Sequence, residues 1–420
     1  MSVPPASVDL VALQRRTVGV LVTGQVLGGI GAGAVLSIGA LLAVEVSGSE
    51  AWAGAAATAS TIGAAIAAVP LARLAQRAGR RIALSAGTLS ALAGAALVVA
   101  ATALGAFPLL LLGYAILGIG TTVGLQARFA ATDLAEPQHR GRALSVVVWS
   151  TTVGVVIGPN LFAPGEVIGD ALGMPVLTGS FVIAVVAQAL AGAVYLVGLR
   201  PDPYLLSRTL ATPPSPDASA EGGVRARRLV VFAIAAVAAA HLVMVSVMAM
   251  TPVHLTHHGS SVALIGFTIS LHVAGMYGLS PVFGWLSDRV GRLGGLLIGQ
   301  ALLAAALAFV GFGADAPALV TVGLVLLGLG WSASTVSGSA LVADLVTGSA
   351  RARIQGRTDL VMSAAGAVGG AAAGPVLALV GYAGLAFWTA LIVLAVVIGV
   401  VIMRATAPAP VPVGAAPSRG

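Results

Sequence analysis

The sequence predicts an all-α integral membrane protein, on the grounds of its composition, its long apolar runs and the placement of its charges. Hydrophobic residues make up 58% of the 420 residues and charged residues 8%, whereas soluble globular domains average about 45–50% and about 25%. The apolar runs are continuous and do not alternate, and a helix needs about 20 apolar residues to cross the hydrocarbon layer. We therefore expect membrane-spanning helices and not a closed β-barrel.

About twelve apolar runs divide into two groups of six. The first group comprises runs 18–42, 51–71, 82–104, 108–131, 144–163 and 176–199, and the second comprises runs 229–251, 261–285, 294–312, 318–342, 360–380 and 385–403. The first run is too long for the core of a signal peptide, so we expect it to remain as the first span. The predicted domains are a six-helix bundle over 1–199, a Pro- and Gly-containing flexible linker over 200–228, a second bundle over 229–403 and a tail over 404–420.

The basic residues predict the orientation of the chain. All 21 are arginines, and they occur in both tails and in every second connecting segment, whereas the other segments carry only acids and histidines. Since Lys and Arg are held on the cytoplasmic side, we expect both termini and the linker in the cytoplasm and the spans in the cell inner (plasma) membrane, among membrane lipids. Arginines scattered in this way argue against a nucleic-acid partner.

The residue types that are missing exclude several kinds of chemistry. The chain has no Cys, which excludes disulfides and thiolate chemistry. It has no Lys, which excludes a Walker-type phosphate loop and a lysine Schiff base. No nucleophile and base of fixed spacing stand near either membrane surface, so we expect no catalytic residues, no enzymatic activity and no bound cofactor.

An internal repeat relates the two groups of runs. The turn Arg77-Ala-Gly79-Arg80 matches Arg289-Val-Gly291-Arg292 at an offset of 291 − 79 = 212 in the numbering. Three further matches lie close to this register: Leu117-Gly-Ile-Gly120 with Leu327-Gly-Leu-Gly330, Gly154-Val-Val-Ile-Gly158-Pro159 with Gly370-Ala-Ala-Ala-Gly374-Pro375, and, more loosely, Arg140-Gly-Arg142 with Arg351-Ala-Arg353. Small residues that let helices pack closely could account for the glycine pairs, but not for the repeated charged turns.

The second charged turn resembles a family signature. The segment Gly284-x-Leu286-x-Asp288-Arg289-x-Gly291-Arg292 is similar to the motif of the major facilitator superfamily in the loop between spans eight and nine. The first-half copy departs from it, because Ala72 replaces the first Gly and Gln76 replaces the Asp. The resemblance implies twelve transmembrane helices in two pseudo-symmetric six-helix bundles, which rock about a shared midplane site during transport.

The resemblance also implies a gate. Asp288 is expected to bind the start of a helix of the opposite half near Leu144, and Arg289 and Arg292 to complete a charge network that closes the inner side. The first-half turn, with Arg77, Gly79 and Arg80, is expected to form a weaker gate because Gln76 carries no charge.

A second motif resembles one subclass of the family in part. Gly154, Gly158 and Pro159 stand where the drug/proton antiporters of the superfamily carry a Gly-x-x-x-Gly-Pro element, which combines a close helix contact with a kink. The glycines that follow in that element are replaced by Phe162 and Ala163. An Arg and a Gln of the antiporter pattern in span four are also missing, since Tyr114 and Leu117 occupy those positions.

Polar residues within the spans are candidates for a substrate or proton path. No Asp or Glu is expected near the middle of any span, and His241 and His272 are expected at a shared depth near the midplane. An imidazole titrates near neutrality, so the pair is our predicted proton carrier, with packing as neutral hydrogen-bonded histidines as the alternative. The amides of Gln25 and Asn160 are predicted to border the cavity, although such amides also bridge helices.

The sequence leaves several functions open. We expect a secondary active transporter that couples proton entry to the efflux of small amphipathic compounds by rocker-switch alternating access, acting as a monomer. The alternatives are a proton-coupled importer of a small nutrient, a metal exporter or a non-transporting membrane sensor. Metal export would use the imidazoles of His254, His257 and His258 with nearby methionine thioethers as ligands, but packing explains these residues better, so we predict no metal site.

Overall fold

A computed structural model describes residues 9–36, 38–49, 52, 55–157, 161–210, 221–346 and 350–405, which form helices joined by short turns, with no strand among them. The first half contains α1 (Leu10–Leu36), α2 (Gly39–Ser47), α3 (Ala55–Ala103), α4 (Phe107–Leu117), α5 (Ile119–Ala130), η2 (Pro137–His139), α6 (Arg140–Ile157), α7 (Phe162–Ala171), α8 (Gly179–Gly198) and α9 (Pro203–Leu210). The second half contains α10 (Glu221–His257), α11 (Val262–Tyr277), α12 (Ser280–Val290), α13 (Arg292–Phe312), α14 (Pro317–Leu345) and α15 (Arg351–Ala405).

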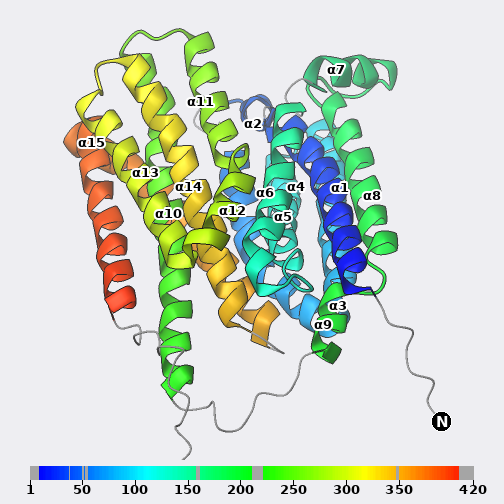
Figure 1. Cartoon of the computed structure of the whole chain (residues 1–420). Helices are drawn as coiled ribbons and strands as arrows, with labels where there is room; N and C mark the ends of the chain where they lie inside the picture. Colours follow the sequence, from blue (N-terminus) through cyan, green and yellow to red (C-terminus); the bar gives the residue numbers. More distant parts are fainter. Residues whose placement is uncertain are drawn as a thin grey trace, which may run out of the picture.

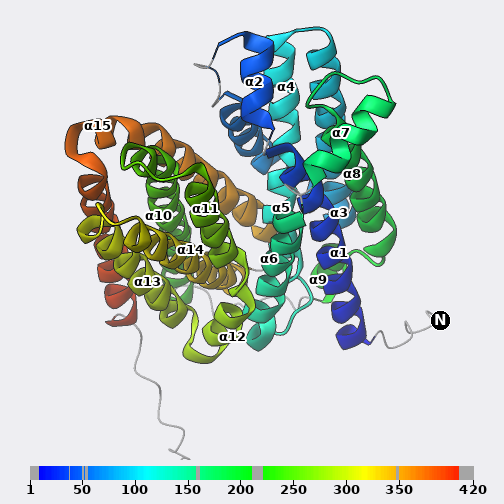
Figure 2. The ribbon, with the colours of Figure 1, turned by 90° about the horizontal axis from the view of Figure 1, so that it is seen from above.

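The helices form two bundles that lie side by side. Helices α1 to α8 make one bundle and α10 to α15 the other (Figures 1 and 2). Within the described residues, eight helical segments are long and apolar enough to cross a membrane. The predicted all-α membrane fold of two bundles is confirmed, while the count of twelve spans stays a prediction.

Glycine allows the chain to reverse at the two charged turns. Gly79 interrupts α3 with φ 86° and ψ 173°, and Gly291 separates α12 from α13 with φ 80° and ψ 157°. A positive φ is strained for residues that carry a Cβ, so glycine is favoured at both turns. The two positions are equivalent in the repeat (291 − 79 = 212), so the repeat seen in the sequence is also a repeat of backbone conformation.

Each bundle has its own apolar core, and a few clusters join the bundles. The largest core surrounds Leu303 and Leu324 in the second half, and the first half has cores around Leu110 and around Leu84. A small cluster of Leu144 and Val148 on α6 with Val336 on α14 spans the interface between the halves.

One end of the molecule carries the arginine-rich segments, and we call it the arginine face. The start of α1, helix α9 and the end of α15 lie at this end (Figure 1). The first charged turn is also there, because the backbone N–H of Arg81 donates to Asp202 just before α9. We use this name for both charged turns and the helix ends around them.

Two short segments differ from the prediction. Helix α7 was not predicted, and part of the predicted flexible linker 200–228 is helical, as α9 and the first residues of α10. Helix α9 forms because Asp202 accepts hydrogen bonds from the backbone N–H groups of Tyr204 and Leu205, and because the Tyr204 side chain is buried. The proposed domain boundaries stay a prediction.

We expect the close contact between α1 and α6 to depend on Gly154. A Cβ on Gly154 would overlap the backbone of Gly29, whereas a Cβ on its repeat partner Gly370 would meet only Val245 Cγ1, at 3.4 Å. Gly154→Ala should therefore destabilise the protein by about 1–3 kcal/mol through overpacking. Gly370→Ala is the matched control and should be neutral or slightly stabilising. The midpoints of thermal unfolding in detergent test this; equal midpoints for the two variants would contradict it.

Candidate functional site

The carboxylate of Asp288 joins the two halves at the arginine face. It lies in the last turn of α12 and accepts hydrogen bonds from the backbone N–H groups of Gly141, at 3.0 Å, and Arg142, at 2.9 Å, at the start of α6. The first N–H groups of a helix have no partner within it, and the helix dipole favours a negative charge there. Arg292 Nη1 donates to the same carboxylate. The structure therefore places Asp288 at the helix start near Leu144.

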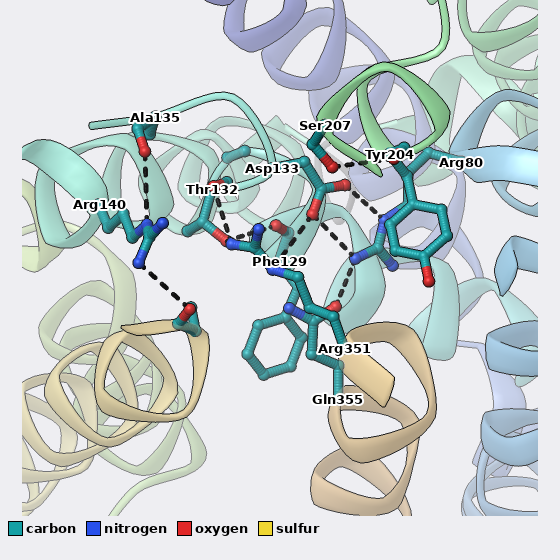
Figure 3. A network of polar contacts seen from close by, with 12 residues as sticks. Arg80, Phe129, Thr132, Asp133, Ala135, Arg140, Tyr204, Ser207, Arg351 and Gln355 are labelled. Carbon is teal, nitrogen blue, oxygen red and sulfur yellow. Dashed lines mark hydrogen bonds and ion pairs between the residues drawn. The ribbon is translucent and has the colours of Figure 1, made fainter. Parts of the chain in front are cut away.

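Two further acids each bind one arginine from either half. Asp344, at the end of α14, accepts from Arg292 Nε at 2.7 Å and from Arg140 Nη1 of the other half at 3.1 Å. Asp133, just after α5, accepts from Arg80 Nε at 2.8 Å and pairs with Arg351 Nε of the other half at 3.6 Å. Figure 3 shows Asp133 between these two arginines.

These contacts form one unit that is used twice. The two acids share one offset in the numbering (344 − 133 = 211), and their own-half arginines (292 − 80 = 212) and opposite-half arginines (351 − 140 = 211) follow the same register. We call this set the gate network, and it consists of Arg80, Asp133, Arg140, Asp288, Arg292, Asp344, Arg351 and Gln355. The charged turns of the sequence repeat pair the arginines, whereas Asp133 and Asp344 were not predicted. Their signal is an Asp-Leu dipeptide in the same register, Asp133-Leu134 and Asp344-Leu345.

The two copies of the unit differ at Gln76, which stands in the first half where the second half has Asp288. In the first half, Asp202, from the segment before α9, accepts a hydrogen bond from the Arg81 backbone N–H at 2.8 Å. The Tyr204 ring lies 5.4 Å from the Arg80 guanidinium carbon, and Arg80 Nη2 also donates to Gln355 on α15. The buried Arg80 is therefore held by the start of the linker as well as by the opposite half.

Arg289 lies outside the gate network, contrary to the expectation that it completes the network. Its guanidinium lies over the Trp285 ring, 4.5 Å from the ring centre, and it forms no ion pair within the described part of the chain. Its repeat partner Arg77 (289 − 77 = 212) is exposed in the same way. The contacts with the acids of the gate network are made by the second arginine of each turn, Arg80 or Arg292.

The two predicted histidines lie in different surroundings, with His272 buried and His241 partly buried. His241 Nδ1 accepts a hydrogen bond from Trp331 Nε1 at 2.9 Å. His272 Nδ1 donates to the Leu324 carbonyl oxygen at 2.7 Å, and its buried Nε2 has no hydrogen-bond partner among the described residues. Both contacts are to α14 but lie seven residues apart (331 − 324), or about 10 Å along the helix axis. The structure therefore presents two separate imidazoles and not a pair.

The structure describes some of the remaining predicted cavity and kink residues. Gln25 on α1 donates to Thr151 Oγ1 on α6 at 3.4 Å and accepts from the Tyr195 hydroxyl on α8 at 3.5 Å, so it bridges three helices. Gly370, Gly374 and Pro375 lie inside α15, where Pro375 interrupts the backbone hydrogen bonding. Three of the predicted residues lie outside the described part of the chain: Gly158, Pro159 and Asn160.

Two of the outer histidines, His254 and His258, contact neighbouring groups. His254 Nε2 donates to the Ala314 carbonyl oxygen at 2.7 Å, and its ring stacks on Tyr382 at 4.1 Å. His258 Nδ1 donates to the His254 carbonyl oxygen at 2.9 Å. Within the ranges that the structure describes, no three His, Asp or Glu residues are placed to hold a metal ion.

A buried ion pair near the ends of two helices was not predicted. Arg128, in the last turn of α5, binds Asp359, eight residues after the start of α15, at 2.6 Å, with both side chains buried. The arginines at 351, 353 and 357 had placed residue 359 in a connecting segment, whereas α15 begins at Arg351. The sequence signal that could have indicated this pair is Asp359 itself, a single acid that follows three arginines.

Comparison with known proteins gives consistent matches along the chain. A family model described as Major Facilitator Superfamily matches residues 21–271 and 232–420. The chain is 38% identical over 374 residues to the uncharacterized MFS-type transporter YddS of Bacillus subtilis (strain 168), a match that covers 87% of this chain and 86% of that protein. It is 28% identical over 353 residues to the riboflavin transporter RfnT of Brucella anthropi, covering 83% of this chain and 85% of that protein.

The fold also matches solved structures. The crystal structure of the human organic anion transporter MFSD10 (TETRAN) superposes with a TM-score of 0.74 at 17% identity, covering 95% of this chain and 100% of that chain. At this identity the likeness shows a shared fold.

We expect Asp288→Asn to loosen the arginine face. The amide keeps the shape but loses the charge that interacts with Arg292 and the α6 dipole, which is worth about 1–2 kcal/mol, or about tenfold in population. The chain has no Cys, so a single cysteine at Leu144, which is buried between the halves, reports opening by its rate of maleimide labelling. Arg289→Gln changes the same turn outside the gate network and should leave the rate unchanged. A wild-type rate in Asp288→Asn would remove Asp288 from the gate.

A second prediction concerns the start of the linker. Tyr204→Ala removes the buried ring that packs on Arg80 and should destabilise the protein by roughly 3–5 kcal/mol. Tyr204→Phe keeps the ring and should stay close to wild type. Thermal unfolding and labelling at Leu144→Cys measure the effect, and similar results for the Ala and Phe variants would show that the ring does not support Arg80.

Proposed function

Because the chain belongs to the major facilitator superfamily, we propose that it is a proton-coupled secondary transporter that exports small amphipathic compounds across the cell membrane by rocker-switch alternating access. Family membership establishes a multi-pass membrane transporter. The direction, the substrate class and the coupling ion are our proposal. Both halves of the gate network lie in one chain, so we propose that the monomer is the working unit.

The repeated gate network carries the proposal. It ties the halves together through side chains at the ends of helices, and Asp288 and Asp344 are 11% and 25% exposed. A carboxylate at a partly exposed helix end contributes a limited free energy, so these contacts can close one face and still release it in each cycle. The arginine distribution supports a cytoplasmic position for this closed face.

The character of the spans supports an amphipathic substrate and proton coupling. Charged residues are rare along the spans, so a cavity between the halves would suit apolar and weakly charged compounds better than phosphates. His272 offers a buried Nε2 without a described hydrogen-bond partner, and His241 lies on the same helix bundle, so both remain our candidates for proton binding. Proton entry down its gradient would then drive export.

Import of a small nutrient is the second candidate, and one finding favours a nutrient as the substrate. A relative at 28% identity is named a riboflavin transporter. A compound panel that includes flavins, tested for uptake and growth protection in cells with and without the protein, separates the two candidates. Uptake into inverted vesicles driven by an acid interior supports export. A protein that shows no counterflow with any compound would instead be a sensor, and the transport proposal would be wrong.

We expect the histidines to affect coupling and not exchange. His241→Ala or His272→Ala should abolish proton-coupled flux while energy-independent exchange of the identified substrate continues, because a titrating group is lost but the alternation between states is not. Gln300→Ala is the control, since Gln300 is a buried polar residue that does not titrate and donates to Ser334 at 3.0 Å. Full coupling in both histidine variants would exclude them as proton carriers.

A further inference from the structure

A buried ion pair crosses the interface between the halves, deeper in the helices than the gate network. Arg128 lies five residues before Asp133 on the first-half side (133 − 128), and Asp359 lies eight residues after Arg351 on the second-half side (359 − 351). Arg128 Nη2 donates to Asp359 Oδ1 at 2.6 Å, and the two side chains are 3% and 0% exposed. The pair is therefore shielded from water in this state.

The pair is incompletely satisfied. Arg128 Nε and Asp359 Oδ2 are buried and have no hydrogen-bond partner in the described part of the chain, and Arg128 Nη2 also contacts Met362 Sδ at 3.7 Å. In Asp133, by contrast, both carboxylate oxygens contact arginines. A buried ion pair contributes to stability only when its remaining atoms are satisfied, so this pair is poorly suited to a purely structural role.

The pair also has no counterpart in the repeat. In the register that relates the two acids of the gate network, the position of Arg128 corresponds to Ser339 (339 − 128 = 211) and that of Asp359 to Val148 (359 − 148 = 211). The corresponding interface is closed by the apolar cluster of Leu144, Val148 and Val336. The repeat-equivalent interface is therefore closed at this depth by apolar residues alone. Closure of the interface does not require an ion pair at this position.

We propose that Asp359 is a proton-binding site that controls the release of the two halves. The inference deepens the proposed function and rests on its proton coupling. A proton that adds to a carboxylate oxygen of Asp359 removes its charge and leaves Arg128 buried without a counter-ion. An unpaired buried charge is strongly unfavourable, so Arg128 gains by separation of the halves and entry of water. Loss of the proton restores the pair and closes the arginine face again.

The groups around the pair are consistent with a local switch. Arg80 on α3 acts on Asp359 electrostatically at longer range, and Gln355, one turn before Asp359, holds Arg80. On the side of Arg128, the titratable neighbours are His241 on α10 and Tyr277 on α11. Among the described residues, Asp359 is thus the acid that directly balances Arg128, and a change in its charge acts on this pair first.

The test measures opening of the arginine face without any substrate. Maleimide reacts with the thiolate, whose fraction falls as the pH falls, so each labelling rate is divided by that of the same variant unfolded in denaturant at the same pH. With the cysteine reporter at Leu144, this normalised wild-type rate should rise about tenfold from about pH 8 to about pH 5.5. Asp359→Asn should label fast at both values. The double variant Arg128→Gln with Asp359→Asn removes both charges, so it should stay closed and show no pH response. If Asp359→Asn does not fold, the double variant decides.

A matched control separates the switch from general loosening of the gate. Asp288→Asn should raise labelling but keep the pH response, because Asp359 is intact. The proposal is overturned if the wild type shows no pH response, or if the double variant keeps the wild-type response. A pH-responsive gate in a protein without proton-coupled flux would refute the proposed function only, whereas coupled flux retained in the double variant would refute this inference only.

Discussion

The unpaired backbone N–H groups at the start of α6 are the constraint on which the closed interface depends. Every helix leaves its first amides without internal partners, and here the carboxylate of Asp288, from the other half, satisfies those of Gly141 and Arg142. Gly141 permits this approach, since a Cβ there would lie 2.6 Å from Asp288 Oδ1. The charge of Asp288 is shared with Arg292, whose other contacts reach Asp344. Two bundles with separate main cores are thereby joined at helix ends, in addition to the apolar cluster of Leu144, Val148 and Val336 between them.

The gate network follows the internal repeat, and the departures from the repeat make its two copies different. Asp133 and Asp344 bind arginines from both halves in the same register. Gln76 breaks this symmetry, and the first-half turn instead receives Asp202 and the Tyr204 ring from the start of the linker. The linker therefore does more than connect the halves, because its first turn is part of the surface that closes. The contacts of α9 with Arg80 are therefore part of what changes or is retained when the halves separate on this side.

The sequence predicted the class of fold and one gate contact, because these depend on local patterns. Apolar length fixes the helices, and the charged turn at Asp288 repeats a family motif. The acids Asp133, Asp344 and Asp359 were missed for a different reason. Their partners lie 52 to 231 residues away in the chain, and no local pattern pairs them. A carboxylate near a span end looks like a surface residue until the opposite half is seen to cover it. The linker helix was missed because the local cap by Asp202 is only part of its stability, and the rest comes from burial of Tyr204, which the short sequence does not show.

The ion pairs differ in depth, and this difference distinguishes the pairs that hold the halves together from the pair that we propose to respond to protons. Asp288 and Asp344 lie at helix ends and keep 11% and 25% of their side-chain surface in water, so they hold the closed face with a limited free energy. Asp133 is buried, but both of its oxygens contact arginines, so its charge is balanced within the gate network. Asp359 is buried with one oxygen unsatisfied and with one arginine that has no other carboxylate among the described residues. A proton added there changes the balance of charge across the interface without touching the contacts that align the halves. The structure thus assigns alignment to the repeated pairs and leaves the pair outside the repeat free to respond to protons.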